Sequence, residues 1–338
     1  MKKWIVFLLA FCLLFGLAGC GKGGEVIDED VDGEEEEIAE DADEEEVDPS
    51  EGEPYVGDSF SKMVGSYNIN TEWIPFAEPL VVDDIFGGYV AVSDNVYYVL
   101  ADGLIKQYKL EDGSLVYEKD LPLEKEYKNI HTDEKGTLYA SAFMADFVGF
   151  RDGEQIFAHY GPDEVAMHPS GGWGVSWFSG PDVEVITLGD GTIESEDWNI
   201  AEVSTIRHMN IGENHIFVSG SSVANEEQAV FVYDLKKKLQ LTLGDKEFGD
   251  PESLGSVTVV IETNNGFMAF DGNYREVLLW KSDGTFIGRI DDEDLFGTKY
   301  PWMSTAVLLP DGSIVAGMTE KRADESAVEF ILYRLTGF

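Results

Sequence analysis

Cysteines and basic residues are scarce in this chain. It has 338 residues, with only two cysteines, and 23 Lys and Arg against 66 Asp and Glu. Both cysteines, Cys12 and Cys20, lie near the N-terminus, so the rest of the chain has no disulfide, no thiolate metal ligand and no cysteine nucleophile. The formal net charge of −43 argues against nucleic acid as a partner, because an acidic surface repels phosphate.

Several catalytic motifs are also missing. The sequence contains no Gly-rich phosphate loop, no His-Glu-x-x-His zinc motif and no Gly-x-Ser-x-Gly nucleophile elbow. No apolar stripe of helical period extends over three turns after residue 54. These absences remove the usual signs of a hydrolase and favour an all-β domain.

The N-terminal segment has the layout of an export signal. Lys2 and Lys3 precede an apolar run over residues 4–15, which is short for a membrane-spanning helix. The run ends in Leu17-Ala18-Gly19-Cys20, which resembles the lipobox of bacterial lipoproteins. That resemblance implies a signal peptide over 1–19, acyl chains such as palmitate on Cys20, and an extracytoplasmic protein anchored to the cell membrane. An ordinary secretory signal or an N-terminal membrane anchor is the alternative.

Residues 20–54 are predicted to form a disordered linker after the lipidated cysteine. Residues 25–53 contain 18 acidic and no basic residues, so this segment repels itself and extends. The linker acts as a solvated spacer in this interpretation. Weak capture of Ca²⁺ or of a cationic partner is the alternative.

From residue 55 onward, aromatic and β-branched residues alternate with polar ones at the period of a β-strand. Asp-Gly pairs, which suit two-residue hairpins, recur at 112–113, 152–153, 190–191 and 283–284, with Lys236–Lys238 in the equivalent place between the last two. A second turn lies upstream of each, at 94–95, 135–136, 171–172, 213–214, 265–266 and 311–312. Two hairpins in every unit of about 40 residues indicate a four-stranded propeller blade.

The repeat predicts a six-bladed β-propeller over residues 55–338. The blades are expected at 87–121, 127–160, 165–197, 205–244, 256–290 and 303–338. The last blade lacks a fourth strand, and a segment within 63–82, for example Trp73–Phe76, is expected to supply it and so to close the ring. The third and fourth units fit less well, which leaves seven blades or an irregular ring as alternatives.

Two stretches carry a resemblance to NHL-type and related six-bladed propellers. They are 131–139 with 148–153, and 277–288, and the likeness rests on turn glycines and strand alternation. The resemblance therefore implies a fold and no particular function.

Two sets of residues are candidate metal ligands, although the sequence demands no cofactor. His131, His168 and His208 fall on or near the innermost strands and could converge in the central channel, where some enzymes of the resembling families bind a metal through histidine. Asp291, Asp292 and Asp294 are the best Ca²⁺ candidate, because hard cations prefer several carboxylate oxygens. Satisfied polar residues and a solvated loop are the alternative interpretations.

Ligands of propellers usually contact the loops that join blades and the loops between the second and third strands. Large residues of the types that dominate recognition sites occur in those loops here. They are Trp177, Phe178, Trp198, Arg207, Tyr274, Arg275, Tyr300, Trp302 and Arg322. Packing between blades is the alternative role for the aromatic members.

The sequence therefore favours a non-enzymatic binding or scaffold lipoprotein that presents a propeller to an extracytoplasmic protein, peptide or glycan. The alternatives are a metal-dependent propeller enzyme of the lyase, lactonase or hydrolase type, and a structural subunit of an envelope complex.

Overall fold

The computed structural model describes residues 53–338, apart from gaps at 84, 123–126, 143–145, 161–163, 190–191, 299–301 and 324. Strands dominate this part of the chain, and its one short helix is α2 (Asp292–Phe296). None of the described helical residues form a segment long and apolar enough to cross a membrane. The predicted signal peptide, Cys20 and the linker up to residue 52 lie outside the described residues, and those features stay predictions.

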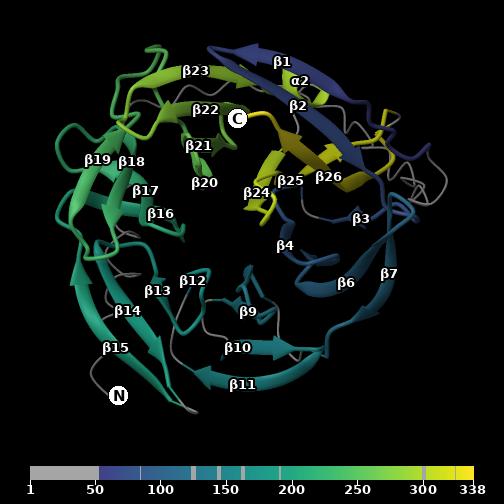
Figure 1. Cartoon of the computed structure of the whole chain (residues 1–338), viewed down its shortest axis with the longest axis horizontal. Helices are drawn as coiled ribbons and strands as arrows, with labels where there is room; N and C mark the ends of the chain where they lie inside the picture. The colour runs from purple at the N-terminus through teal and green to yellow at the C-terminus, as the bar shows by residue number, and fades with distance from the viewer. Residues whose placement is uncertain are drawn as a thin grey trace, which may run out of the picture. The chain divides into compact units, whose positions relative to one another are not determined.

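The strands form six antiparallel sheets around a common axis, which confirms the predicted six-bladed propeller (Figure 1). The first blade contains β4 (Tyr89–Ser93), β5 (Val96–Ala101), β6 (Leu104–Glu111) and β7 (Ser114–Asp120). The second contains β8 (Asn129–Thr132), β9 (Leu138–Ser141), β10 (Asp146–Arg151) and β11 (Glu154–Tyr160). The third contains β12 (Glu164–Met167), β13 (Trp173–Trp177), β14 (Asp182–Leu188) and β15 (Ile193–Asn199).

The remaining blades follow the same order from the axis outward. The fourth contains β16 (Val203–Ile211), β17 (His215–Ser222), β18 (Gln228–Asp234) and β19 (Leu239–Leu243). The fifth contains β20 (Val257–Thr263), β21 (Gly266–Asp271), β22 (Glu276–Lys281) and β23 (Phe286–Asp291). The third and fourth units, which fitted the repeat less well, are therefore complete four-stranded blades.

The sixth blade is built from both ends of the domain. It takes β24 (Trp302–Leu308), β25 (Ile314–Lys321) and β26 (Val328–Thr336) from the C-terminal side. From the N-terminal side it takes β1 (Phe60–Val64), β2 (Tyr67–Ile74) and β3 (Val81–Val82). Trp73 pairs with Tyr333 and Ile74 with Leu332, so the predicted closure by the N-terminal segment is confirmed.

The innermost strands form a closed ring. Each of β4, β8, β12, β16 and β20 contacts the next inner strand in this order, and β24 contacts β4. Six clusters of buried apolar residues fill the six interfaces between neighbouring blades. Middle strands are covered on both faces, as in the fully buried β21, whereas the outer strand β7 is mostly exposed. This difference explains why the middle strands read as continuous apolar runs.

Two faces of the propeller follow from this strand order. The turns between first and second strands, and between third and fourth strands, lie on one face, which we name the hairpin face. The loops between second and third strands and the connections between blades lie on the opposite face, which we name the loop face. The described members of the predicted ligand-binding set lie in loops of this face or near the strand ends that meet it, apart from Arg207 in the middle of β16.

Candidate functional site

Side chains bridge the inner strands around the axis. The Thr132 hydroxyl of β8 donates to the Val92 carbonyl of β4 at 2.8 Å. On β16, the Asn210 amide side chain donates to the Val260 carbonyl of β20 and accepts from the Val260 N–H. These bridges satisfy backbone groups of Val92 and Val260 at the edges of β4 and β20. The channel wall is thereby held in a fixed shape.

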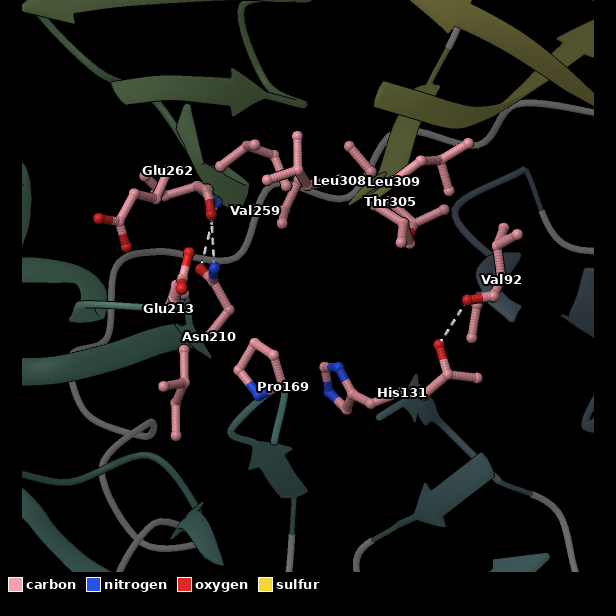
Figure 2. A pocket seen from close by; sticks show the side chains of 18 of the residues that line it. Val92, His131, Pro169, Asn210, Glu213, Val259, Glu262, Thr305, Leu308 and Leu309 are labelled. Carbon is pink, nitrogen blue, oxygen red and sulfur yellow. Dashed lines mark hydrogen bonds between the residues drawn. The ribbon is translucent and has the colours of Figure 1, made fainter. Parts of the chain in front are cut away.

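The channel contains a pocket of about 850 Å³. Figure 2 shows side chains from all around the axis lining it, among them Val92, His131, Asn210, Val259 and Thr305. The first-to-second-strand turns of five blades line its mouth, so it opens on the hairpin face. Its volume lies within the range of roughly 300–1,000 Å³ that is usual for small-molecule sites.

Two of the three predicted channel histidines meet in this pocket. His131 and His208 both line it and interact electrostatically. Burial lowers the pKa of His131 from 6.5 to about 4, and a hydrogen bond with the Val165 backbone partly opposes this effect. Burial, and secondly the nearby His131, lower the pKa of His208 to about 3. Both rings are therefore neutral at pH 7.

The third histidine lies elsewhere. His168 follows β12 in a turn of the hairpin face, where its ring stacks on Trp173 with centroids 4.9 Å apart. Its Nδ1 is 2.8 Å from the Ser170 hydroxyl, and its Nε2 is 3.4 Å from the Glu213 carbonyl of the next blade. The structure thus brings together two of the three histidines, and His168 joins blades three and four instead.

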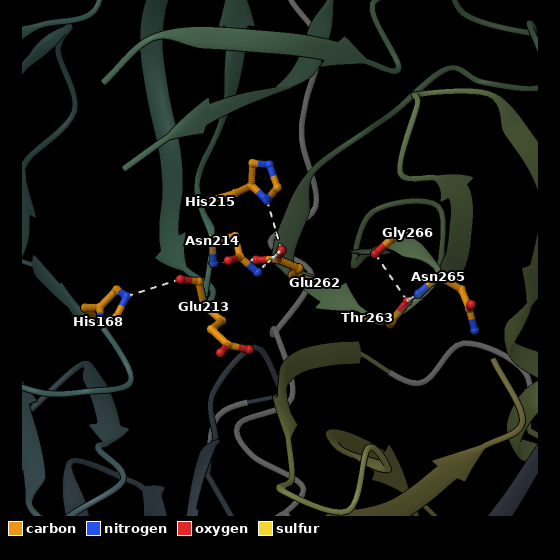
Figure 3. Close-up of polar contacts among 8 residues, drawn as sticks. All are labelled: His168, Glu213, Asn214, His215, Glu262, Thr263, Asn265 and Gly266. Atoms are coloured by element: carbon orange, nitrogen blue, oxygen red, sulfur yellow. Dashed lines mark hydrogen bonds and ion pairs between the residues drawn. The ribbon is translucent and has the colours of Figure 1, made fainter. Parts of the chain in front are cut away.

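A carboxylate fastens the next pair of blades on the same face (Figure 3). Glu262 of β20 accepts two hydrogen bonds from Asn214, one from the backbone N–H and one from the side chain, both of 3.0 Å. The same carboxylate lies 2.9 Å from Nδ1 of His215. These contacts fix the turn that carries Glu213 and hold it at the rim of the pocket.

Two of the predicted ligand-binding aromatics are packed between blades. Trp177 is 2% exposed and contacts His208 edge to face at 5.8 Å. Trp198 is 9% exposed and contacts Tyr233 of β18 in the same manner at 5.2 Å. Both belong to the apolar cluster between blades three and four, although both also line a smaller pocket of about 530 Å³. Both side chains therefore pack between blades, which was the alternative to a role in ligand binding.

Other predicted aromatics are presented on the loop face. Phe178 is 57% exposed in the loop after β13. Trp302, at the start of β24, is half-buried and contacts the 62% exposed Phe86 edge to face at 4.9 Å. Tyr274 lies after β21, and its ring is 6.0 Å from that of Phe248, which is 82% exposed. Tyr300 lies outside the described residues.

The predicted arginines have three different environments. Arg322 is 5% exposed and its guanidinium lies 2.5 Å from the equally buried carboxylate of Glu329, so this pair is part of the sixth blade's interior. Arg207 is exposed and occupies a β-bulge of β16, where a side chain is turned out of the ladder. Arg275 is half-buried and has a positive φ of 59° in the loop after β21.

The acidic run proposed for Ca²⁺ caps a helix. Asp291 is the N-cap of α2 and accepts a hydrogen bond from the Asp294 N–H at 2.9 Å. Asp292 and Asp294 lie in the first turn, where negative charge is favoured by the helix dipole, and Asp294 pairs with Lys62. Across the described ranges, no group of three or more His, Cys, Asp or Glu side chains is arranged to hold a metal ion.

The residues at the pocket mouth and two exposed aromatics were not predicted from the sequence. Glu134, Glu213 and Asp311 occupy or adjoin predicted turns, but a turn position does not show which residues face the axis. Phe86 and Phe248 lie in connections between blades, where the only available signal was an apolar residue among polar neighbours.

Two solved structures are similar to this chain. A chain of hydrazine synthase from Kuenenia stuttgartiensis matches with a TM-score of 0.52 and 14% identity, over 72% of this chain and 82% of that chain. The WD40 β-propeller domain of Doa1 matches with a TM-score of 0.48 and 10% identity, over 78% and 97% of the two chains. At 14% identity the likeness to the hydrazine synthase chain concerns the fold alone, and no conclusion is drawn from the match to Doa1.

Sequence comparisons add no family. No protein-family model matches the chain, and no curated protein matches it. The likeness to NHL-type propellers therefore stays a resemblance, whereas the assignment to six-bladed β-propellers rests on the sheet topology and on a ring that both chain ends close.

Proposed function

We propose that this protein is a non-enzymatic binding propeller, anchored by a lipid on Cys20 and held away from the membrane by its acidic linker. Its loop face would contact a protein, peptide or glycan outside the membrane. The observation that carries this proposal is the exposure of three phenylalanines, Phe86, Phe178 and Phe248, in separate loops of one face.

Exposure of this kind favours an interface because aromatic residues are enriched at protein interfaces. Each of these rings exposes more than half of its surface, and two of them are extended by the half-buried Trp302 and Tyr274. Aromatic residues supply most of the binding energy in many recognition sites. A rigid propeller would present them in fixed positions, so little entropy would be lost on binding.

In-cell crosslinking of the full-length protein tests this proposal. A triple variant, Phe86→Ser, Phe178→Ser and Phe248→Ser, is expected to lose the crosslinked partner while the protein remains folded. The matched control replaces exposed apolar residues away from the loop face, with Val116→Ser, Ile156→Ser and Leu235→Ser, and should retain the partner. Equal crosslinking in both variants would contradict the assignment of the loop face.

A further inference from the structure

The pocket on the axis combines apolar walls with a negatively charged mouth. Val92, Val259, Ile261, Leu308 and Leu309 contribute apolar surface. Figure 2 shows Leu308 and Leu309 side by side on the wall, across the opening from His131 and Pro169. A ligand with an apolar body could bury its surface against this wall. Each Å² of apolar surface removed from water would contribute roughly 25 cal/mol of binding free energy.

The charged side chains that line the pocket are all acidic. Five carboxylates line the pocket, and none of its described lining residues is Lys or Arg. The five are Asp133, Glu134, Glu213, Glu262 and Asp311.

Three of these carboxylates already have strong partners. Asp133 accepts hydrogen bonds from the Lys135 and Thr137 N–H groups and from the Tyr139 hydroxyl. Glu262 is held by the neighbouring hairpin, and Asp311 pairs with Arg334. Glu134 and Glu213 are exposed and come from different blades. They are therefore the groups best placed to meet a ligand's positive charge.

The deeper wall adds an acceptor and no positive charge. His131 and His208 are neutral at pH 7, because burial lowers the pKa of both rings. The hydrogen bond of His131 with the Val165 backbone favours its protonated form, so the ring N–H donates in that bond. Its Nε2 is buried and has no hydrogen-bond partner among the described residues, which leaves a lone pair without a donor.

We propose that this pocket binds small organic ammonium ions that carry an apolar body. The apolar walls would cover the body, while the carboxylates at the mouth would attract the charge and repel anions. The strongly acidic protein around a concave site concentrates cations there. A bare metal ion fits less well, because no three ligating side chains converge among the described residues. This site lies on the hairpin face and does not depend on the proposed role of the loop face.

Three probes of the same shape and different charge test the proposal. Isothermal titration of the full-length protein at about 150 mM salt would compare 1-adamantylammonium, 1-adamantanecarboxylate and 1-adamantanol. The ammonium ion is expected to bind with one-to-one stoichiometry and at least about tenfold more tightly than the carboxylate, since two exposed carboxylates contribute up to about 1 kcal/mol each. Equal affinity for the cation and the anion would overturn the proposal.

A pair of double variants locates the site. Glu134→Gln with Glu213→Gln is expected to weaken binding of the ammonium ion about tenfold and to leave the affinity for adamantanol unchanged. Glu226→Gln with Glu247→Gln removes the same charge from exposed residues of the loop face and should change neither affinity. If both double variants weaken binding equally, the cation responds to the overall acidity, including that of the linker, and the pocket is not the site.

Discussion

Asp271 organises two loops of the loop face at once, which makes it the most informative position for mutation. It ends β21, is fully buried, and its carboxylate accepts hydrogen bonds from four backbone N–H groups. Those groups belong to Gly255, Ser256, Asn273 and Tyr274. The first two lie in the connection from the fourth blade, and the last two lie in the loop that carries Tyr274 and Arg275.

The substitution Asp271→Asn keeps the shape of the side chain but replaces one acceptor oxygen with a donor. At least one N–H that bonded that oxygen loses its acceptor, and the remaining hydrogen bonds lose the negative charge. The donor left unsatisfied costs about 1–3 kcal/mol and the weakening of the remaining hydrogen bonds about 1 kcal/mol more, so we expect a loss of about 2–4 kcal/mol in the free energy of unfolding. A domain with roughly 5–15 kcal/mol of stability would remain folded but more easily denatured.

Urea denaturation followed by tryptophan fluorescence measures this loss, with Asp250→Asn as the control. Asp250 lies in the same connection between blades, is exposed, and accepts from the Glu252 N–H at 2.9 Å. Its substitution should cost less than about 1 kcal/mol. If Asp271→Asn also costs less than about 1 kcal/mol, the four hydrogen bonds do not stabilise the loops, and the reasoning fails.

Three further predictions concern other parts of the chain. Glu329→Gln removes the buried carboxylate charge that pairs with Arg322, so it should lower the free energy of unfolding by about 1.5–3 kcal/mol, whereas breaking the exposed pair of Lys237 and Glu196 by Lys237→Ala should cost less than about 1 kcal/mol. Burial lowers the pKa of His131 to about 4, so below pH 6.5 the unfolded state binds a proton that the folded state does not. The free energy of unfolding should therefore fall as the pH drops from 7 to 5. Denaturation curves at the two pH values should show that His131→Gln reduces this fall by about 2 kcal/mol. Cys20→Ser should move the protein from the membrane fraction to the soluble fraction on cell fractionation, and retention in the membrane would argue for an uncleaved N-terminal anchor.

The turns explain why the blade count could be predicted from the sequence. Asp112 and Gly113 have φ of 49° and 85°, and Asp152 and Gly153 have φ of 54° and 78°, so these two Asp-Gly pairs occupy the positive-φ positions of a tight hairpin, whereas in the pair at 283–284 only Gly284 has a positive φ, of 84°. Lys237 takes a φ of 66° in the equivalent turn of the fourth blade. Local backbone chemistry of this kind is readable in the sequence, because few residues tolerate it.

The site residues were less predictable, because their environment depends on neighbouring blades. Trp177 and Phe178 are adjacent in sequence, yet the first is buried against His208 of the next blade and the second is exposed. Trp177 ends β13 and Phe178 begins the loop that follows, and the sequence does not show where between two such large residues the strand ends or which of them the next blade covers. Likewise, the spacing of the histidines did not show that His168 would leave the channel for a turn.

The closure of the ring by the N-terminal segment is the central structural claim, and an engineered disulfide tests it most directly. In a Cys12→Ser and Cys20→Ser background, Asn70→Cys and Thr336→Cys occupy paired positions of β2 and β26. Paired positions bring Cβ atoms to about 5 Å, whereas the diagonal pair Glu72→Cys and Thr336→Cys is separated by about 7–8 Å. We predict a rapid, nearly complete disulfide in the first variant and little in the second, as read by non-reducing electrophoresis. A folded protein that forms no disulfide between positions 70 and 336, or forms both to the same extent, would contradict the closure.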